Sequence, residues 1–301
     1  MSSIGFIGLG RMGTPMAARL AAAGPLIVYD IDADRTAAFA AEHSGTHRVE
    51  AADNPKDLAA RADVIITMLP TSAIVRDAVW TGDQSCRSSL KAGQLIIDMS
   101  SSDPADTKQL GEDLQSVGVG LVDAPVSGGV KRAVAGTLAV LVGGDSEEDV
   151  DRAAGLLGAV GDPIVKVGAL GSGHIMKALN NLLSATTLAA SAEVLAAGAA
   201  AGINPNVMLD VLNASSGRNN STETKIRQFV YSGTFGSGFA LDLMVKDLDL
   251  ADAILQRSGT SASITSATRE TWKRAQSDLS GHDHTEIAAW LGAPAGHDKK
   301  G

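Results

Sequence analysis

Cysteine, aromatic residues and positive charge are scarce in this chain of 301 residues. Cys86 is the only cysteine, so no intramolecular disulfide can form, and we expect a reducing compartment, by default the cytoplasm. The formal net charge of −9 argues against nucleic acid as a partner, because binding its phosphates requires a basic surface. Aromatic residues make up only 3% of the chain, whereas glycine occurs 33 times, a composition that suits backbone lying close to a ligand.

Long apolar runs, targeting signals and metal-ligand patterns are also missing from the sequence. The most apolar stretch, residues 188–201, contains Glu193 and is shorter than the roughly 18 residues that a membrane span requires. The first residues lack a basic leader with an apolar run of signal length, so we expect neither a signal peptide nor a membrane partner. The six histidines have no ligand spacing, and we expect no metal.

Apolar runs alternate with helical patterns in the first half of the chain. The runs lie at residues 4–7, 26–29, 64–68, 95–97, 121–122 and 138–142, and the helical patterns at 15–23, 33–42, 55–60, 73–79 and 105–116. Apolar strands that alternate with helices are typical of a parallel sheet covered on both faces. We therefore predict an α/β Rossmann domain with a mostly parallel, doubly wound sheet over residues 1–165.

The second half of the chain has no strand pattern after about residue 167. A helical pattern dominated by Ala, Leu and Met runs from residue 174 to about 201, and the remainder reads as helical to about residue 291. We predict an all-α domain over residues 166–292, joined to the first by a long interdomain helix, and a flexible tail at 293–301. An apolar face on that helix predicts a homodimer or homotetramer.

A glycine-rich loop follows the first predicted strand directly and precedes a helical pattern. Gly8 permits a tight turn, Gly10 lets a pyrophosphate approach the backbone, and Gly13 allows close packing of helix on strand. The amino end of the following helix presents free N–H groups to the phosphate charge. The predicted pyrophosphate-binding residues are Gly8, Leu9, Gly10, Arg11, Met12 and Gly13.

An acidic residue stands at the end of the second predicted strand, about 20 residues beyond the loop. Asp30 at this position accepts hydrogen bonds from the adenine ribose hydroxyls and repels a 2′-phosphate, so we predict NAD as the cofactor. Arg35 favours NADP instead, but Asp32 and Asp34 outweigh it. The alternative is a purely structural turn in which Asp30 caps a helix.

Four ordered blocks of sequence closely resemble motifs of the β-hydroxyacid dehydrogenase family. They are GFIGLGRMGTPMA at residues 5–17, DAPVSGG at 123–129, GSGHIMKALNN at 171–181 and KDL at 246–248. Residues 25–30, 68–72 and 215–218 are most similar to the 3-hydroxyisobutyrate dehydrogenases, whereas residues 219–225 are more polar than a methyl-bearing substrate requires. The resemblance implies hydride transfer between a nicotinamide cofactor and a small 3-hydroxy acid or its semialdehyde. A more polar substrate, such as tartronate semialdehyde, is the alternative.

A lysine and an asparagine on the long predicted helix are the candidates for proton transfer. Lys177 lies among apolar residues, and partial burial would lower its pKa toward neutrality, which suits a general acid and base. Asn181 follows at i+4 on the same helix face and can orient Lys177 or the substrate hydroxyl. The resemblance implies that Lys177 is the catalytic lysine and Asn181 its partner. Without the resemblance, Lys177 is interpreted as a surface lysine and Asn181 as an asparagine that packs between helices.

A second glycine turn is the candidate for binding a small carboxylate substrate. Ser127, Gly128 and Gly129 follow an apolar segment and offer a hydroxyl and backbone N–H groups, and the resemblance implies that they hold the substrate carboxylate. The alternative is a plain turn.

Further cofactor contacts are expected at the ends of the third and fourth predicted strands, because doubly wound sheets bind ligands there. The expected residues are Leu69, Pro70 and Ser101. The resemblance adds Lys246 as a residue that contacts nicotinamide and substrate, whereas a surface pair with Asp247 or Asp249 is the alternative.

Two alternative functions are imine reduction and a non-catalytic dinucleotide-binding module. The presence of Lys177 in the long helix argues against both.

Overall fold

The computed structural model describes residues 3–44 and 48–296. The chain forms two compact units that divide between Lys177 and Ala178, inside helix α8 (Ser172–Ala200). The boundary expected at residue 165 falls within strand β9 (Gly161–Gly168), which pairs with β8 (Leu138–Gly143), so the first unit continues beyond it.

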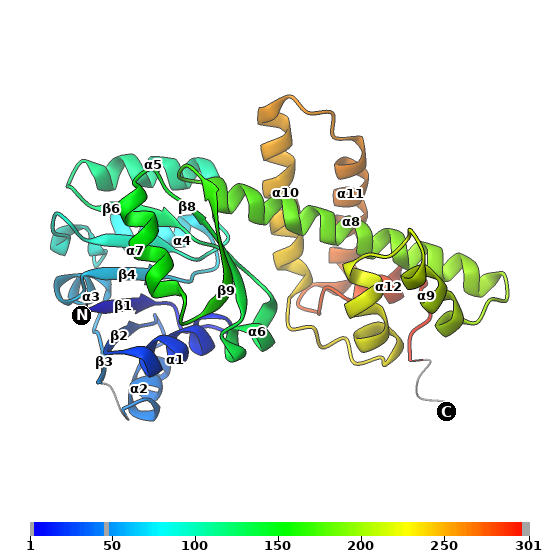
Figure 1. Ribbon diagram of the computed structural model, residues 1–301, viewed down its shortest axis with the longest axis horizontal. Helices are drawn as coiled ribbons and strands as arrows, with labels where there is room; N and C mark the ends of the chain where they lie inside the picture. The colour runs from blue at the N-terminus through cyan, green and yellow to red at the C-terminus, as the bar shows by residue number, and fades with distance from the viewer. Residues whose placement is uncertain (1–2, 45–47, 297–301) are drawn as a thin grey trace. The chain divides into compact units, whose positions relative to one another are not determined.

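The first unit is built on one mostly parallel sheet with the strand order β3-β2-β1-β4-β5-β6-β8-β7, and β9 lies on β8 (Figure 1). The pairings among β1 to β6 are parallel, whereas β8 runs antiparallel to β6 and β7. The remaining strands are β1 (Ile4–Ile7), β2 (Leu26–Tyr29), β3 (Val49–Ala51), β4 (Val64–Thr67), β5 (Leu95–Asp98), β6 (Gly120–Asp123) and β7 (Val126–Ser127). This architecture confirms the predicted doubly wound α/β fold.

Helices connect the strands of the first unit and produce two separate hydrophobic cores. Phe6 and Ile66 lie in one core, whereas their neighbours Ile7 and Ile65 lie in the other, because successive strand residues point to opposite faces. Burial on both faces explains why these strands read as continuous apolar runs. The helices are α1 (Gly13–Ala23), α2 (Ala33–Glu42), α3 (Pro55–Arg61), α4 (Ser72–Arg76), the π-helix η1 (Asp77–Thr81), the 3₁₀ helix η2 (Cys86–Ser89), α5 (Pro104–Gln115), α6 (Gly129–Ala135) and α7 (Glu147–Leu157).

Three strands were not predicted, and each lacks the signal of a buried strand. β3 and β7 have only three and two residues. β9 is longer, but most of its residues are exposed or half-buried, so its sequence has no apolar run. The helix expected at residues 73–79 is instead α4 followed by the π-helical turn η1.

The second unit is helical, which confirms the predicted all-α domain. It contains the later part of α8, then α9 (Pro205–Ala214), the π-helix η3 (Ser221–Tyr231), α10 (Leu241–Ser258), α11 (Ser263–Leu279) and α12 (Glu286–Trp290). Trp272 and Tyr231 are the largest fully buried side chains of its core. Asn204 caps α9, since its Oδ1 accepts from the N–H groups of Asn206 and Val207.

Helix α8 is the one described helix that is long and apolar enough, by length and composition alone, to cross a membrane. Core helices of soluble proteins pass the same test, and Ala185, Leu188 and Leu195 of α8 are fully buried in the core of the second unit. At the end of the chain, Ala293 is buried and the Gly296 N–H donates to the Val230 carbonyl. Residues 297–301 of the expected tail lie outside the described residues.

Candidate functional site

The glycine loop between β1 and α1 combines tight packing with one open position. At Gly8, φ is 103°, and an added Cβ would lie 2.4 Å from the Met68 carbonyl oxygen. At Gly13, a Cβ would lie 1.8 Å from the Gly8 carbonyl oxygen, whereas at Gly10 it would meet nothing within 4 Å. No described side chain caps α1. The exposed Gly10 and the uncapped helix end therefore fit a pyrophosphate, while Gly8 and Gly13 hold the loop in shape.

Asp30 is bound to this loop by a direct hydrogen bond. Its Oδ2 accepts from the Leu9 N–H at 2.7 Å, and its Oδ1 accepts from the Asp32 N–H at 3.0 Å. Arg35 lies 3.4 Å from Oδ1 and also pairs with Asp32. A carboxylate has about four acceptor positions, so Asp30 retains capacity for a ribose hydroxyl. The residue therefore fixes the loop and presents a carboxylate beside it at the end of β2.

The carboxyl ends of β4 and β5 are joined by a chain of hydrogen bonds. The half-buried Leu69 donates its N–H to Ser100 Oγ at 2.9 Å, and the Ser100 N–H donates to Asp98 Oδ1 at 3.0 Å. Pro70 is exposed and Ser101 is half-buried at the same edge. The expected strand-end residues are therefore close together along this edge, but Ser100 and Asp98, which hold Leu69, were not among the predicted residues.

The second glycine turn adopts a backbone conformation that favours glycine. Ser127 is half-buried at the end of β7, and Gly128 and Gly129 have φ values of 135° and 69°. The Arg132 side chain packs against Gly128, with Cδ 2.6 Å from the place of an added Cβ. The turn therefore exposes backbone at the edge of the sheet, as a carboxylate cradle requires.

Lys177 is half-buried near the beginning of α8, and strand β6 anchors that beginning. Asp123 at the end of β6 accepts from the Gly171 N–H at 2.7 Å and from the His174 N–H at 2.8 Å. Burial raises the pKa of the Asp123 carboxyl, although His174 and the two N–H groups oppose this shift. Asp123 and His174 both lie in the sequence motifs at residues 123–129 and 171–181, but the sequence alone does not predict that the two residues contact each other.

Asn181 lies beyond the division of the chain and is held by an acid of the second unit. Its Nδ2 donates to Asp247 Oδ2 at 2.6 Å, and its Oδ1 accepts from Asn180 Nδ2 at 3.2 Å. Asp247 is 1% exposed, and Lys246 Nζ lies 3.4 Å from its Oδ1. Asp247 thus orients Asn181 and pairs with Lys246. The sequence offers this acid only as a surface partner of the lysine, whereas in the structure it is buried.

The polar segment at residues 219–225 has a structural explanation. Asn219 Oδ1 accepts from the N–H groups of Ser221 and Thr222, so it caps the start of η3. Its Nδ2 donates to Ser191 Oγ, and Lys225 donates to Ser184 Oγ. The polarity that suggested a polar substrate at Asn219 therefore serves the local fold.

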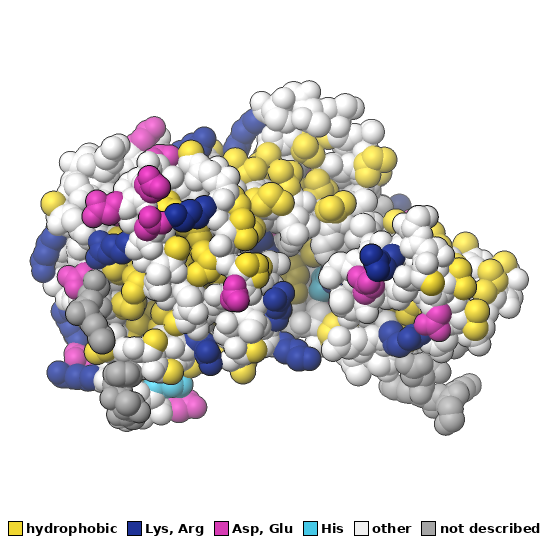
Figure 2. Space-filling view, in the orientation of Figure 1, with side chains coloured by type: hydrophobic (Ala, Val, Ile, Leu, Met, Phe, Trp, Pro, Cys, Tyr) yellow, Lys and Arg dark blue, Asp and Glu magenta, His cyan; other side chains and the backbone are white. Residues whose placement is uncertain are grey.

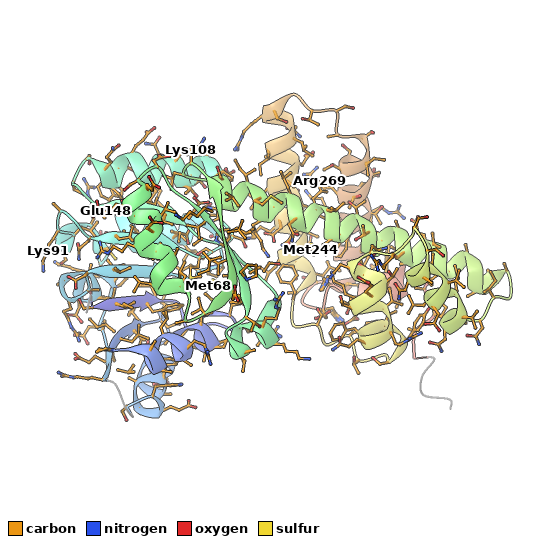
Figure 3. The ribbon with its side chains drawn as sticks, viewed as in Figure 1. Met68, Lys91, Lys108, Glu148, Met244 and Arg269 are labelled. Atoms are coloured by element: carbon orange, nitrogen blue, oxygen red, sulfur yellow. The ribbon has the colours of Figure 1, made fainter. Side chains whose placement is uncertain are left out.

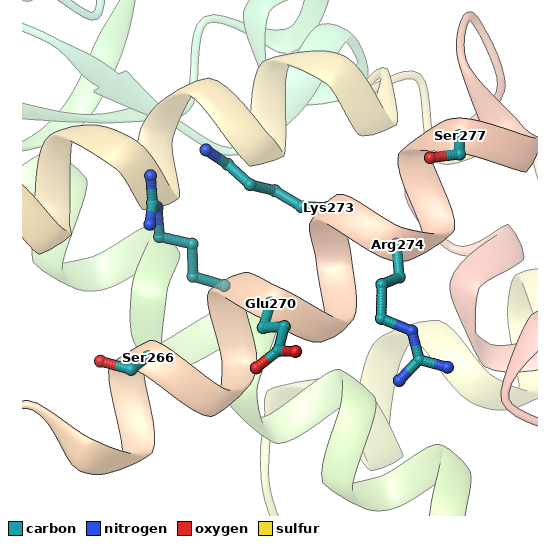
Figure 4. Close-up of a pocket in the computed structure, with 6 residues that line it drawn as sticks. Ser266, Glu270, Lys273, Arg274 and Ser277 are labelled. Atoms are coloured by element: carbon teal, nitrogen blue, oxygen red, sulfur yellow. The ribbon is translucent and has the colours of Figure 1, made fainter.

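A surface pocket lies along α11 (Figure 4). Its lining residues are Ser266, Arg269, Glu270, Lys273, Arg274 and Ser277. Arg269 and Lys273 both pair with Asp249, and Arg274 lies over the Trp290 ring. None of the predicted site residues lines this pocket. Within residues 3–44 and 48–296, no group of three or more His, Cys, Asp and Glu could hold a metal ion.

Comparison with known proteins gives matches to both units. Residues 3–170 match the NAD binding domain of 6-phosphogluconate dehydrogenase, and residues 171–291 match the NAD-binding domain of NADP-dependent 3-hydroxyisobutyrate dehydrogenase. The chain is 41% identical over 249 residues to 2-(hydroxymethyl)glutarate dehydrogenase of Eubacterium barkeri, covering 82% of this chain and 80% of the relative. It is 40% identical over 255 residues to human mitochondrial 3-hydroxyisobutyrate dehydrogenase, covering 82% and 74%.

A solved structure has the same fold over almost the whole chain. Mycobacterium tuberculosis 3-hydroxyisobutyrate dehydrogenase with L-serine superposes with a TM-score of 0.87 at 31% identity, covering 97% of this chain and 99% of the other. The glycine loop, the strand-end acid and the matched domains agree on a nicotinamide dinucleotide as cofactor. The chain therefore belongs to the β-hydroxyacid dehydrogenase family of nicotinamide-dinucleotide-dependent oxidoreductases.

Proposed function

We propose that the chain transfers a hydride between NAD and a small 3-hydroxy acid of the 3-hydroxyisobutyrate class, with Lys177 as the general acid and base. The observation that carries this proposal is the anchoring of the first turn of α8 by Asp123. That turn belongs to the same compact unit as the glycine loop and the Ser127 turn, and it is followed directly by Lys177. A fixed helix end is the kind of support that a proton-transfer group needs.

Each residue has a separate task in the proposed reaction. A bound nicotinamide would supply the hydride acceptor for the alcohol carbon in the oxidising direction. Lys177 Nζ takes the hydroxyl proton in that direction and returns it during reduction. Ser127 and the N–H groups of Gly128 and Gly129 hold the substrate carboxylate. Asn181, oriented by Asp247, fixes the hydroxyl, and Lys246 adds positive charge for the anionic substrate.

The choice of NAD rests on charge at the end of β2. Asp30, Asp32 and Asp34 place three carboxylates within five residues, and Arg35 is already paired with the first two. A 2′-phosphate entering there meets this negative charge, whereas a ribose hydroxyl donates to it.

A substrate panel tests the proposal and resolves the substrate. The wild-type protein is assayed with NAD and NADP on 3-hydroxyisobutyrate, 2-(hydroxymethyl)glutarate and L-serine, and with NADH and NADPH on tartronate semialdehyde. We expect the highest kcat/KM for a 3-hydroxy acid with NAD. A preference for tartronate semialdehyde assigns a more polar substrate, and turnover of none of the panel contradicts the proposed substrate class.

We also propose that the second unit packs against another copy of the chain. Hydrophobic side chains are exposed on the surface over α9 (Figure 2), where Val207 and Val211 are 57% and 58% exposed. Contiguous exposed apolar surface is typical of subunit interfaces. Light scattering should give a dimer or tetramer, and a monomer at micromolar concentration contradicts this expectation.

A further inference from the structure

A buried histidine lies between two buried carboxylates where α8 meets the sheet. His174 Nε2 lies 3.7 Å from Asp98 Oδ2, and His174 Nδ1 lies 3.7 Å from Asp123 Oδ2. The three side chains are almost completely excluded from solvent. The negative charge of Asp98 disfavours ionisation of Asp123, and a cation between the two carboxylates offsets this repulsion. None of the three was among the predicted site residues.

The contacts of Thr107 favour a proton on Nδ1 of His174. Thr107 Oγ1 lies 3.1 Å from the Asp103 carbonyl, which can only accept, and 2.9 Å from His174 Nδ1. A hydroxyl has one proton, so both contacts are hydrogen bonds when Thr107 donates to the carbonyl and Nδ1 donates to Thr107. Nε2 has no hydrogen-bond partner among the described residues and faces the Asp98 carboxylate. An unprotonated Nε2 would direct its lone pair at that negative charge, whereas a protonated one is attracted to it.

The same cluster connects two parts of the proposed site. Asp98 accepts from the Ser100 N–H, and Ser100 in turn holds Leu69 at the cofactor edge. Asp123 accepts from the first turn of α8, and His174 lies between the two acids. Lys177 follows His174 by three residues, which is almost one helical turn. The cluster thus joins the carboxyl end of β5 to the helix that carries the lysine.

We propose that His174 is held as an imidazolium cation between Asp98 and Asp123, and that its charge fixes the first turn of α8, which makes it a positioning residue for Lys177. This inference rests on the proposed role of Lys177. Charged residues also occur on the elements next to the cluster. Lys108 of α5, labelled in Figure 3, has its Cε 3.5 Å from the place of an added Cβ on Gly171, and Asp145 accepts from the Leu170 N–H.

Nuclear magnetic resonance of the ¹⁵N-histidine-labelled wild-type protein tests the charge state. We expect both ring nitrogens of His174 to be protonated near pH 7. The spectra of His174→Asn and His282→Asn assign the two signals. An unprotonated Nε2 near pH 7 overturns the proposal. The charge state is measured on the wild-type protein and requires no enzymatic activity. The two variants serve only to assign the signals.

Kinetics of matched variants test the positioning role. Asparagine at position 174 can still donate to Thr107 but carries no charge, so His174→Asn should lower kcat by at least about tenfold with the KM for NAD within about threefold. His282→Asn is the control and should match wild type. Unchanged kcat in His174→Asn overturns the role of the charge.

Failure of this inference and failure of the proposed function are distinguishable. If Lys177→Ala turns over substrate normally, the proposed function fails, while the resonances of His174 still report its charge. If Lys177→Ala is inactive and His174 is neutral, the proposed function stands and the positioning role of the charge falls.

Discussion

Replacing Asp30 with asparagine tests how the chain discriminates between NAD and NADP. The change removes one negative charge at a position that is 7% exposed and leaves an oxygen that can still accept from the Leu9 N–H. It also releases Arg35 from one of its two carboxylate partners. We therefore expect the glycine loop to keep its shape while the repulsion of a 2′-phosphate weakens.

The magnitude follows from Coulomb's law at contact distance. Two unit charges about 4 Å apart interact by about 1 kcal/mol in water and about 4 kcal/mol near a protein surface. A central value of about 2 kcal/mol corresponds to about 30-fold in the ratio of kcat/KM for NAD to kcat/KM for NADP. Both values are obtained from initial rates with saturating substrate, in wild type and Asp30→Asn.

Glu148→Gln is the matched control for this prediction. Glu148 lies in the first turn of α7 and is exposed to solvent. Its charge is screened and it is not among the predicted cofactor-binding residues, so the coenzyme ratio should change by less than about threefold. An equal loss of kcat/KM with both coenzymes in Asp30→Asn would show that the residue only supports the loop, which would refute the role in discrimination.

Three further predictions follow from the geometry of the site and the core. Gly10→Ala should raise the KM for NAD with little change in Tm, whereas Gly13→Ala should lower Tm, because its Cβ would lie 1.8 Å from a carbonyl oxygen. Asp247→Ala should lower kcat by about 100-fold through loss of the bond that orients Asn181, with Tm as the control. Burial lowers the pKa of His284 to about 4, so the folded state excludes a proton that the unfolded chain binds below about pH 6.5. Stability is therefore complete above that pH and falls by up to about 3 kcal/mol as pH drops toward 4, and a flat profile in urea unfolding would contradict it.

The sheet of the first unit was predictable where strands are buried on both faces. β1, β2, β4 and β5 are continuous apolar runs because neighbouring residues enter opposite cores. The edge strand β9 was not predicted because most of its side chains are exposed to solvent or half-buried, so its sequence has no apolar run and resembles that of a loop. Short β3 and β7 depend on backbone pairing with their neighbours, which composition does not reveal.

The site residues were predictable when a local motif determines them. Two glycines of the loop are required by local geometry, because Gly8 has a positive φ and a Cβ on Gly13 would meet the Gly8 carbonyl oxygen. The bond from Leu9 to Asp30 joins residues 21 positions apart, and the contact of Asn181 with Asp247 spans 66 positions. Such bonds depend on tertiary packing, so the individual residues could be named from the sequence but their partners could not.

The most direct test of the central claim is single-turnover hydride transfer in Lys177→Ala. NADH formation is followed after mixing enzyme, NAD and the best substrate of the panel, so that product release does not limit the rate. The account predicts a loss of about 100-fold to 10,000-fold relative to wild type, the usual contribution of a general acid or base. Lys166→Ala, which removes an exposed lysine paired with Asp151, should react at the wild-type rate. Undiminished hydride transfer in Lys177→Ala would contradict the account.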